Sequence, residues 1–366
     1  MDLLHIAASV AGALIVSLIL WDAFETMIVP RPLLRILRFR LTKLFYPTLW
    51  AIWRRVVQLL AQGGRREAYL GAFGPLSVLG IIGIWAALLV LGFGLIHWGT
   101  MSPVEAPDRR ISFGTYLYLS GVTFFTLGYG DVTPRMGLGR SMMVLEAAVG
   151  FIFLAVVISY LPLLYQAFAR REAGVAAMYR RAGTPPTPTA LLWRYGARRK
   201  FAELGALIAQ WENWTTELQE TYRSYPMLAL YRSHQGTQSW LATLTTMLDS
   251  CALLTLEMQG TPMWHEPLRF QAELTFEVGC EIVEDLLLLL DIAPPTKSVD
   301  RLSPDDWAIL HAQLALGGLL LSDNQTVEAE LVRLRRRYEP GISVLASHLL
   351  LPMPPWVPGG TQQRGQ

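Results

Sequence analysis

The segment Thr126-Leu127-Gly128-Tyr129-Gly130 combines residue types and spacing that could bind a dehydrated monovalent cation. Glycines at alternate positions can adopt left-handed dihedral angles without a Cβ penalty, so successive carbonyl oxygens can turn toward one axis. The Thr126 hydroxyl would close the inner end of this ladder, and Tyr129 could pack sideways and brace it. A ring of such carbonyls replaces the hydration shell of an ion the size of potassium. The segment therefore predicts an ion site made mainly of backbone oxygens.

The flanking segments favour an ion-binding loop over the alternative, a glycine-rich turn before a helix. Residues 112–125 form an uncharged, aromatic stretch of about three and a half helical turns, with Ser112 placed to cap its start. Residues 131–134 form a turn that ends in proline. Apolar runs long enough to span a membrane lie on both sides, at 76–98 and 142–168. This pattern predicts a short re-entrant helix and a loop between two membrane spans.

With these flanks, residues 73–170 resemble the tetrameric potassium channel family, and Thr126 to Asp131 matches the selectivity filter of that family. The resemblance covers a little over a quarter of the chain. It implies a pore module over 73–171 and a homotetramer, because one chain carries one filter segment. The implied parts of the module are an outer helix at 74–99, a pore helix at 112–125, the filter at 126–130 and an inner helix at 137–168.

The same resemblance implies that potassium is the transported ion and that no other cofactor is needed. The implied potassium ligands are the Thr126 hydroxyl and the backbone carbonyls of Thr126, Leu127, Gly128, Tyr129 and Gly130. Leu127 stands where many members have valine or isoleucine, but the filter uses only the carbonyl of that residue. Val122 stands where some members carry a carboxylate that supports the filter from behind.

The composition indicates a membrane protein with a large soluble part. Hydrophobic residues make up 52% of the chain and charged residues only 16%, against roughly 25% in soluble domains. A third apolar run, residues 3–21, could form about 28 Å of helix. We expect a retained transmembrane helix within residues 1–30, since a signal peptide would have a preceding basic residue and a cleavage site. Asp22 and Glu25 are expected just beyond it, at the interface.

Basic residues set the expected orientation. They are concentrated between residues 30 and 73 and again after residue 169, so both regions should be cytoplasmic. The protein is then a multi-pass protein of the cell membrane, in bacteria the inner membrane, with its N-terminus outside and its C-terminus cytoplasmic. Asp131 falls at the outer mouth, where Glu105 and Asp108 could help to concentrate cations.

Residues 31–72 predict a basic, amphipathic segment on the cytoplasmic leaflet, with a helix over 33–61. Leucines recur at near-helical spacing between arginines, which is typical of an interfacial helix and suits anionic lipid better than nucleic acid. A voltage sensor also uses arginines, but it spaces them through a spanning helix, and this segment is too polar to span.

Three residues of the inner helix are candidates for a role in gating or ion binding. Gly150 could act as a hinge or allow close helix packing, and Pro162 should kink the helix near a constriction at 159–162. Glu146 is the only carboxylate in this run. It could contact ions or form hydrogen bonds behind the pore helix.

Beyond a proline-rich linker at 182–189, residues 190–351 predict an all-helical cytoplasmic domain, followed by a disordered tail at 352–366. No strand followed by Gly-x-Gly-x-x-Gly is found, so the nucleotide-binding regulatory domain of many such channels is not expected. Four acids, Glu273, Glu277, Glu281 and Asp285, recur every four residues. A divalent-cation site is one interpretation; the other is a solvated face, or pairing with arginines at 333–337.

No triad, Walker motif or nucleophile elbow is present, so the chain is not expected to be an enzyme. We predict an all-α membrane protein that conducts potassium passively and is gated through its cytoplasmic domain. Two alternatives remain. One is a weakly selective cation channel, and the other is a membrane scaffold or sensor whose helical domain is the functional output.

Overall fold

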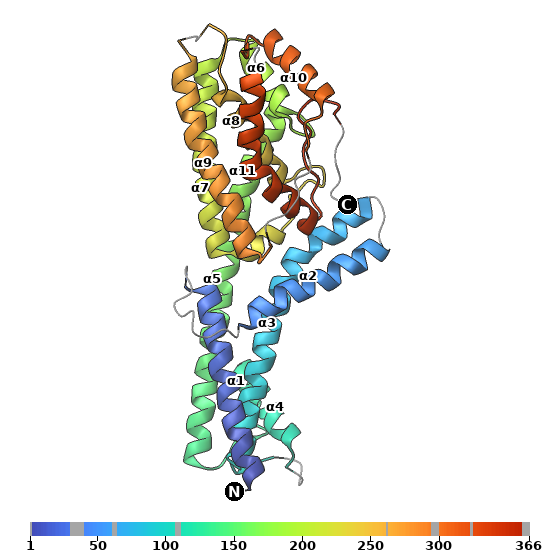
Figure 1. Ribbon diagram of the computed structural model, residues 1–366. Coiled ribbons are helices and arrows are strands. Elements are labelled where there is room, and N and C mark those ends of the chain that lie inside the picture. The colour runs from blue at the N-terminus through green and yellow to red at the C-terminus, as the bar shows by residue number, and fades with distance from the viewer. Residues whose placement is uncertain are drawn as a thin grey trace. The chain divides into compact units, whose positions relative to one another are not determined.

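The structure is a computed structural model that describes residues 2–29, 40–60, 64–106, 111–260, 263–293, 300–322 and 325–360. The chain divides into two compact units (Figure 1). Unit 1 comprises Met1–Ala61 and Ala72–Tyr165, and unit 2 comprises Gln62–Gly71 and Gln166–Gln366. Two long helices, α3 (Gly64–Gly99) and α5 (Gly137–Ala182), contribute residues to both units.

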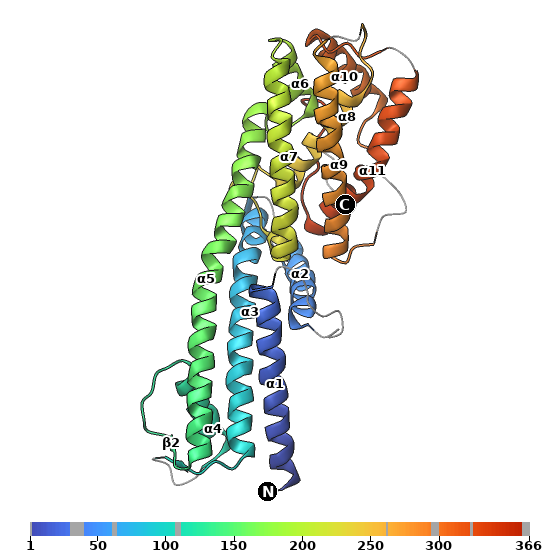
Figure 2. The same ribbon diagram turned by 90° about the vertical axis from the view of Figure 1, so that its left-hand side faces the viewer.

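Unit 1 contains long helices and one short helix, α4, near the Gly99 end of α3 (Figures 1 and 2). Its other elements are α1 (Leu3–Met27), α2 (Leu41–Leu60), α4 (Phe113–Phe124), and the antiparallel strands β1 (Val104–Glu105) and β2 (Thr133–Pro134). Three of the described helices, α1, α3 and α5, are long and apolar enough to cross a membrane. This confirms the three predicted spans.

Both predicted pore-module spans are shorter than the helices in the structure. The outer helix was expected from residue 74 and begins at Gly64, and the inner helix was expected to end at 168 and continues to Ala182. Pro75 and Pro162 lie inside these helices. A proline removes one backbone hydrogen bond, which bends a helix without ending it when packing holds both sides. The linker was expected at residues 182–189. In the structure only residues 183–187 are outside helices, because α5 ends at Ala182 and α6 begins at Pro188.

The first helix packs on the outer helix of the same chain, a choice that the sequence left open. A Cβ added to Gly12 of α1 would collide with the Gly92 carbonyl oxygen of α3, and one added to Gly99 would collide with Ser9. Small residues at such positions let two helix backbones approach closely in a membrane. Apolar side chains of α1 and α3, among them Ile19 and Trp85, then form one buried cluster.

Both acids at the end of α1, which were expected to reach the interface, are buried within the chain. The Asp22 carboxylate accepts hydrogen bonds from Trp85 Nε1 at 2.9 Å and from Thr42 Oγ1 at 3.2 Å. Glu25 lies 3.2 Å from Arg40 Nε. Buried carboxylates need such partners, and the partners come from residues 15 or more positions away, which local sequence does not indicate.

The expected interfacial segment is only partly a helix of unit 1. Residues 30–39 lie outside the described residues, and α2 covers 41–60 with exposed apolar side chains such as Leu44 and Ile52 beside a buried Val57. Residues 62–71 group with unit 2 and include the first turns of α3. The single segment predicted over 31–72 therefore divides between two helices and two units.

The described residues of unit 2 are mainly helical, as predicted, with one isolated β-bridge between Met258 and Leu321. Its elements after α5 are α6 (Pro188–Gly196), α7 (Phe201–Ser224), a short 3-10 helix η1 (Pro226–Leu230), α8 (Trp240–Thr255), α9 (His265–Leu289), α10 (Pro304–Leu316) and α11 (Gln325–Leu349). Helix α8 is buried from Trp240 to Leu254 and packs against α9 and α11. A helix that is buried on every side forms the core of a helical domain.

The tail predicted to be disordered from residue 352 is instead packed through residue 357. Met353, Trp356 and Val357 are buried, and Thr189 Oγ1 donates to the Trp356 carbonyl at 2.6 Å. The Arg301 guanidinium lies over the Trp356 ring at 5.4 Å. Disorder was predicted from the proline and glycine content of this segment. An extended, proline-rich chain can nevertheless bury aromatic side chains such as Trp356. Residues 361–366 lie outside the described part.

Candidate functional site

Helix α4 (Phe113–Phe124), which precedes the loop at residues 126–130, is fixed by hydrogen bonds and by buried side chains. Ser112 N donates to Thr115 Oγ1 at 3.2 Å at the start of the helix, as expected of a capped terminus. Tyr116 OH donates to the Ser102 carbonyl at 2.9 Å, and Leu119 and Phe124 are buried. The bounds Phe113–Phe124 agree with the pore helix expected at 112–125.

The backbone after α4 alternates between left-handed and other conformations. The φ angles of Thr126, Gly128 and Gly130 are +56°, +61° and +74°. Both glycines thus adopt the left-handed conformation predicted for them, and Thr126 adopts it despite its Cβ. The Leu127 amide donates back to the Val122 carbonyl at 2.9 Å, which fixes the loop to the end of α4.

The carbonyl oxygens of residues 126–130 differ from those of the neighbouring helices in their hydrogen bonding. In the described part of the chain, none of the hydrogen bonds outside helices and strands is accepted by these carbonyls. Two side chains of the same segment are largely exposed in the single chain, Leu127 at 55% and Tyr129 at 68%. The bracing role expected of Tyr129 therefore has no counterpart within one chain.

The three acids expected at the outer mouth differ in their surroundings. Asp131 Oδ2 accepts a hydrogen bond of 2.9 Å from Tyr118 OH of α4. Glu105 forms an exposed ion pair of 3.3 Å with Arg135 where β1 meets β2. Asp108 lies outside the described residues. The sequence analysis did not predict the hydrogen bond between Tyr118 of α4 and Asp131 at the end of the loop, because no local sequence pattern indicates it.

Glu146 of α5 lies behind α4 and does not face an open path. Its side chain is fully buried, with Oε2 at 3.2 Å from His97 Nε2 of α3 and Oε1 in hydrogen-bond contact with Ser120 Oγ of α4. This decides between the two locations that the sequence left open. The sequence did not indicate that His97 and Ser120 would contact Glu146, although His97 is the only ionisable residue of its apolar run.

Gly150 lies one turn after Glu146, where α5 crosses the end of α4. A Cβ at this position would collide with the Phe124 carbonyl oxygen. This contact favours close packing over a hinge as the reason for glycine, and the hinge stays a prediction. Pro162 lies further along the same helix. There, a hollow of about 320 Å³ is lined by Met27, Ile28, Phe151, Ile152, Ala155, Val156, Ser159, Tyr160 and Leu163.

Replacing Gly150 by alanine is expected to lower both thermal stability and ion flux. The added methyl group would force α5 away from α4, and overpacking of this kind costs about 1–3 kcal/mol. A pure hinge role predicts the opposite effect on stability, since alanine favours a helix by about 1 kcal/mol over glycine. Thermal unfolding and liposome flux of the variant measure both effects. Gly83→Ala is the matched control, because a Cβ there meets nothing within 4 Å.

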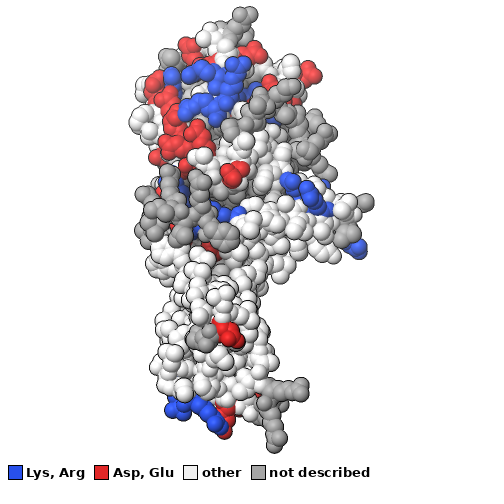
Figure 3. Space-filling model, turned by 60° about the horizontal axis from the view of Figure 1, so that its bottom comes forward, with Lys and Arg blue, Asp and Glu red and all other residues white. Residues whose placement is uncertain are grey.

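Three of the four acids of the α9 stripe are paired with basic residues, and one of these bases, Arg337, comes from the expected range 333–337. Glu277 meets Arg337 at 2.6 Å, Glu273 meets Arg269 at 2.9 Å and Asp285 meets Arg223 at 2.7 Å. The Arg337 guanidinium lowers the pKa of Glu277. Among the described residues, no group of three or more His, Cys, Asp or Glu side chains is placed to hold a metal ion. On the face that Figure 3 shows, acids and bases gather mainly on unit 2, whereas most of unit 1 is uncharged.

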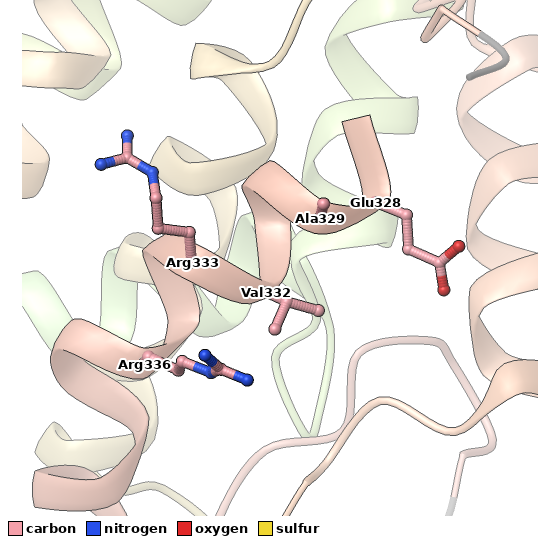
Figure 4. A pocket seen from close by; sticks show the side chains of 5 residues that line it. All are labelled: Glu328, Ala329, Val332, Arg333 and Arg336. Carbon is pink, nitrogen blue, oxygen red and sulfur yellow. The ribbon is translucent and has the colours of Figure 1, made fainter. Parts of the chain in front are cut away.

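A second hollow, of about 420 Å³, lies on α11 and does not form a convincing binding site. All of its lining residues come from that one helix: Glu328, Ala329, Val332, Arg333 and Arg336 (Figure 4). The guanidinium groups of Arg333 and Arg336 and the carboxylate of Glu328 point in different directions. Arg333 is also paired with Glu330 at 2.8 Å. Ligand sites need polar groups that converge on one point.

Comparison with known proteins identifies an ion-channel segment that includes residues 126–130. A family model described as "Ion channel" matches residues 79–165. Protein LctB of Geobacillus stearothermophilus is 38% identical over 94 residues, which cover 23% of this chain and 69% of LctB, and protein LctB of Bacillus caldotenax matches to the same extent. The chain belongs to the ion channel family. It is therefore a multi-pass membrane protein with an ion-channel pore module, and it is not an enzyme.

A weaker similarity covers more of the chain. The uncharacterized membrane protein YdjJ of Bacillus subtilis (strain 168) is 23% identical over 206 residues, which make up 56% of this chain and 59% of YdjJ. No solved structure matches.

Proposed function

We propose that four copies of this chain form a channel that conducts potassium selectively and passively. The observation that carries the proposal is the backbone of residues 126–130, where left-handed residues alternate and the carbonyls accept none of the hydrogen bonds found within the described chain. One chain supplies one such segment, and a ring of carbonyls around a single-file ion needs several. Leu127 and Tyr129, exposed in the single chain, would be covered by the neighbouring copies.

In this pore, potassium would shed its water, bind between successive carbonyl layers and leave by repulsion from the next ion. Thr126, Leu127, Gly128, Tyr129 and Gly130 would supply the backbone ligands, with the Thr126 hydroxyl at the inner end. Asp131 would raise the local cation concentration at the outer mouth. The basic residues flanking the spans support a cytoplasmic location for unit 2 and contact with anionic lipid.

We further propose that unit 2 biases the channel between open and closed states through α5. The part of α5 within unit 2 is clamped to η1 and the residue that follows it, because Arg171 donates to the Leu228 carbonyl at 2.8 Å and the Tyr231 carbonyl at 3.1 Å. The neighbouring Glu172 accepts from His234 N at 3.1 Å. The same helix carries Gly150 and Pro162, so a movement of this clamp would act on the inner helix directly.

A flux assay with purified full-length protein in liposomes tests the proposal. We expect rapid potassium and rubidium uptake, little sodium uptake, and block by barium, which has nearly the size of potassium but a double charge. Mass measurement in detergent should give four chains. Equal potassium and sodium uptake would support a weakly selective cation channel instead. Absence of any ion flux from a folded tetramer would support a scaffold or sensor.

A further inference from the structure

Three buried polar side chains meet behind α4, each from a different helix of unit 1. They are His97 of α3, Ser120 of α4 and Glu146 of α5, and none is more than 1% exposed. Glu146 Oε2 lies 3.2 Å from His97 Nε2, Oε1 is in contact with Ser120 Oγ, and Ser120 Oγ also lies 2.8 Å from the Val90 carbonyl oxygen of α3. This carboxyl cluster therefore joins all three helices of the pore module at one point.

The hydrogen-bond contacts of Ser120 indicate where the protons are. A serine hydroxyl carries one proton, and both the Val90 carbonyl and an ionised carboxylate can only accept. Ser120 cannot donate to both at once. If it donates to Val90, the contact with Glu146 is satisfied only when the carboxyl group carries the proton and donates it to Ser120. The other carboxyl oxygen then accepts from the Nε2–H of a neutral His97.

The surroundings of the cluster favour this neutral arrangement. An ionised carboxylate buried in a membrane span requires a charged partner. In the described part of the chain, His97 is the one titratable side chain in contact with Glu146. A positively charged His97 would need an acceptor at Nδ1 as well, and Nδ1 has no hydrogen-bond partner. A neutral acid and a neutral imidazole leave fewer buried groups unsatisfied.

We propose that Glu146 is a positioning residue, held as a neutral carboxylic acid, that fixes the pore helix between the outer and inner helices. Glu146 and Gly150 are one turn apart on α5, and their contacts on α4, Ser120 and Phe124, are also one turn apart. The two contacts fix both the height and the rotation of α4. Thr126 follows directly after this fixed end, so the geometry of residues 126–130 depends on the cluster. The effect on conduction rests on the proposed channel function.

Substitution of Glu146 distinguishes a neutral acid from an ionised one. Glutamine has the same shape and can donate to Ser120 while accepting from His97, so Glu146→Gln should keep the potassium-to-sodium permeability ratio within about twofold of the wild type. Glu146→Ala leaves His97 without its hydrogen-bond partner. We expect the potassium-to-sodium permeability ratio to fall at least roughly tenfold, which is within the range of typical coupling between two sites of a protein. Loss of selectivity in Glu146→Gln as large as in Glu146→Ala would overturn the proposal, and so would wild-type selectivity in Glu146→Ala.

Infrared spectroscopy tests the protonation state without relying on conduction. At neutral pH, the wild-type spectrum should contain the carbonyl band of a buried carboxylic acid, and Glu146→Gln should lack it. Glu217→Gln, which changes an exposed carboxylate of α7, should retain it. If the wild type lacks the band, the proposal is wrong even if the channel is selective. If the band is present but the wild type passes no potassium, the proposed function fails and the assignment of the neutral acid stands.

Discussion

Replacing Gly128 by alanine is expected to abolish potassium flux while leaving the assembled protein intact. Gly128 has a φ angle of +61°, and its Cβ position is open, so the penalty is one of backbone conformation and not of collision. An L-residue pays about 1–2 kcal/mol for a left-handed conformation, which reaches about 4–8 kcal/mol when four chains must adopt it together. At about 1.4 kcal/mol for each factor of ten, intact filters would become rarer by roughly a thousandfold or more.

The measurement is rubidium uptake into liposomes, together with the oligomeric mass of the variant. Gly137→Ala is the matched control, because Gly137 also has an open Cβ position but no left-handed φ angle. The control should conduct like the wild type. Normal uptake by Gly128→Ala would mean that the carbonyls of this loop do not line the path.

The second large effect is expected from replacing Arg171 by methionine. The Arg171 guanidinium is buried, contacts Glu172 Oε1 at 2.9 Å and supplies donors to two backbone carbonyls of unit 2. Its removal leaves Glu172 buried without a counter-ion, which typically costs about 3–5 kcal/mol. The melting temperature of unit 2 should fall by roughly 6–20 °C. Ion selectivity should be unchanged, while the open probability should shift by about 5–150-fold.

Calorimetry and single-channel recording measure these two effects separately. Arg170→Met is the control, since the neighbouring Arg170 is exposed and its loss should affect neither. The double variant Arg171→Met/Glu172→Gln removes both charges and should recover part of the lost stability. A destabilised unit 2 with an unchanged open probability would show that this clamp does not transmit gating.

The parts of the molecule that the sequence predicted well depend on local chemistry. Left-handed glycines at 128 and 130, the start of α4 at Ser112 and the three apolar spans follow from residue type and spacing within a few positions. The interpretation of Glu146 could not be reached in this way. Its partners, His97 and Ser120, are 49 and 26 residues distant, and only the packing of three helices brings them together.

The main errors have a related cause. Judged from its own segment alone, the pair Asp22 and Glu25 looks interfacial. Judged in the same way, the chain after residue 352 looks disordered. Trp85 buries Asp22, and Thr189 and Arg301 hold the tail through Trp356 and its neighbours. In each case a partner distant in sequence overrides the local preference. Helices α3 and α5 likewise extend beyond their expected bounds, to Gly64 and Ala182, and the additional turns belong to unit 2, which is built from residues distant in sequence.

The most direct test of a selective carbonyl filter is the reversal potential of the purified channel in a planar bilayer with potassium on one side and sodium on the other. If ions pass dehydrated between the backbone oxygens of residues 126–130, the reversal potential should be close to the potassium equilibrium potential. This should hold whichever side of the bilayer contains potassium. A reversal potential near zero would contradict the account, because potassium and sodium would then cross with similar ease.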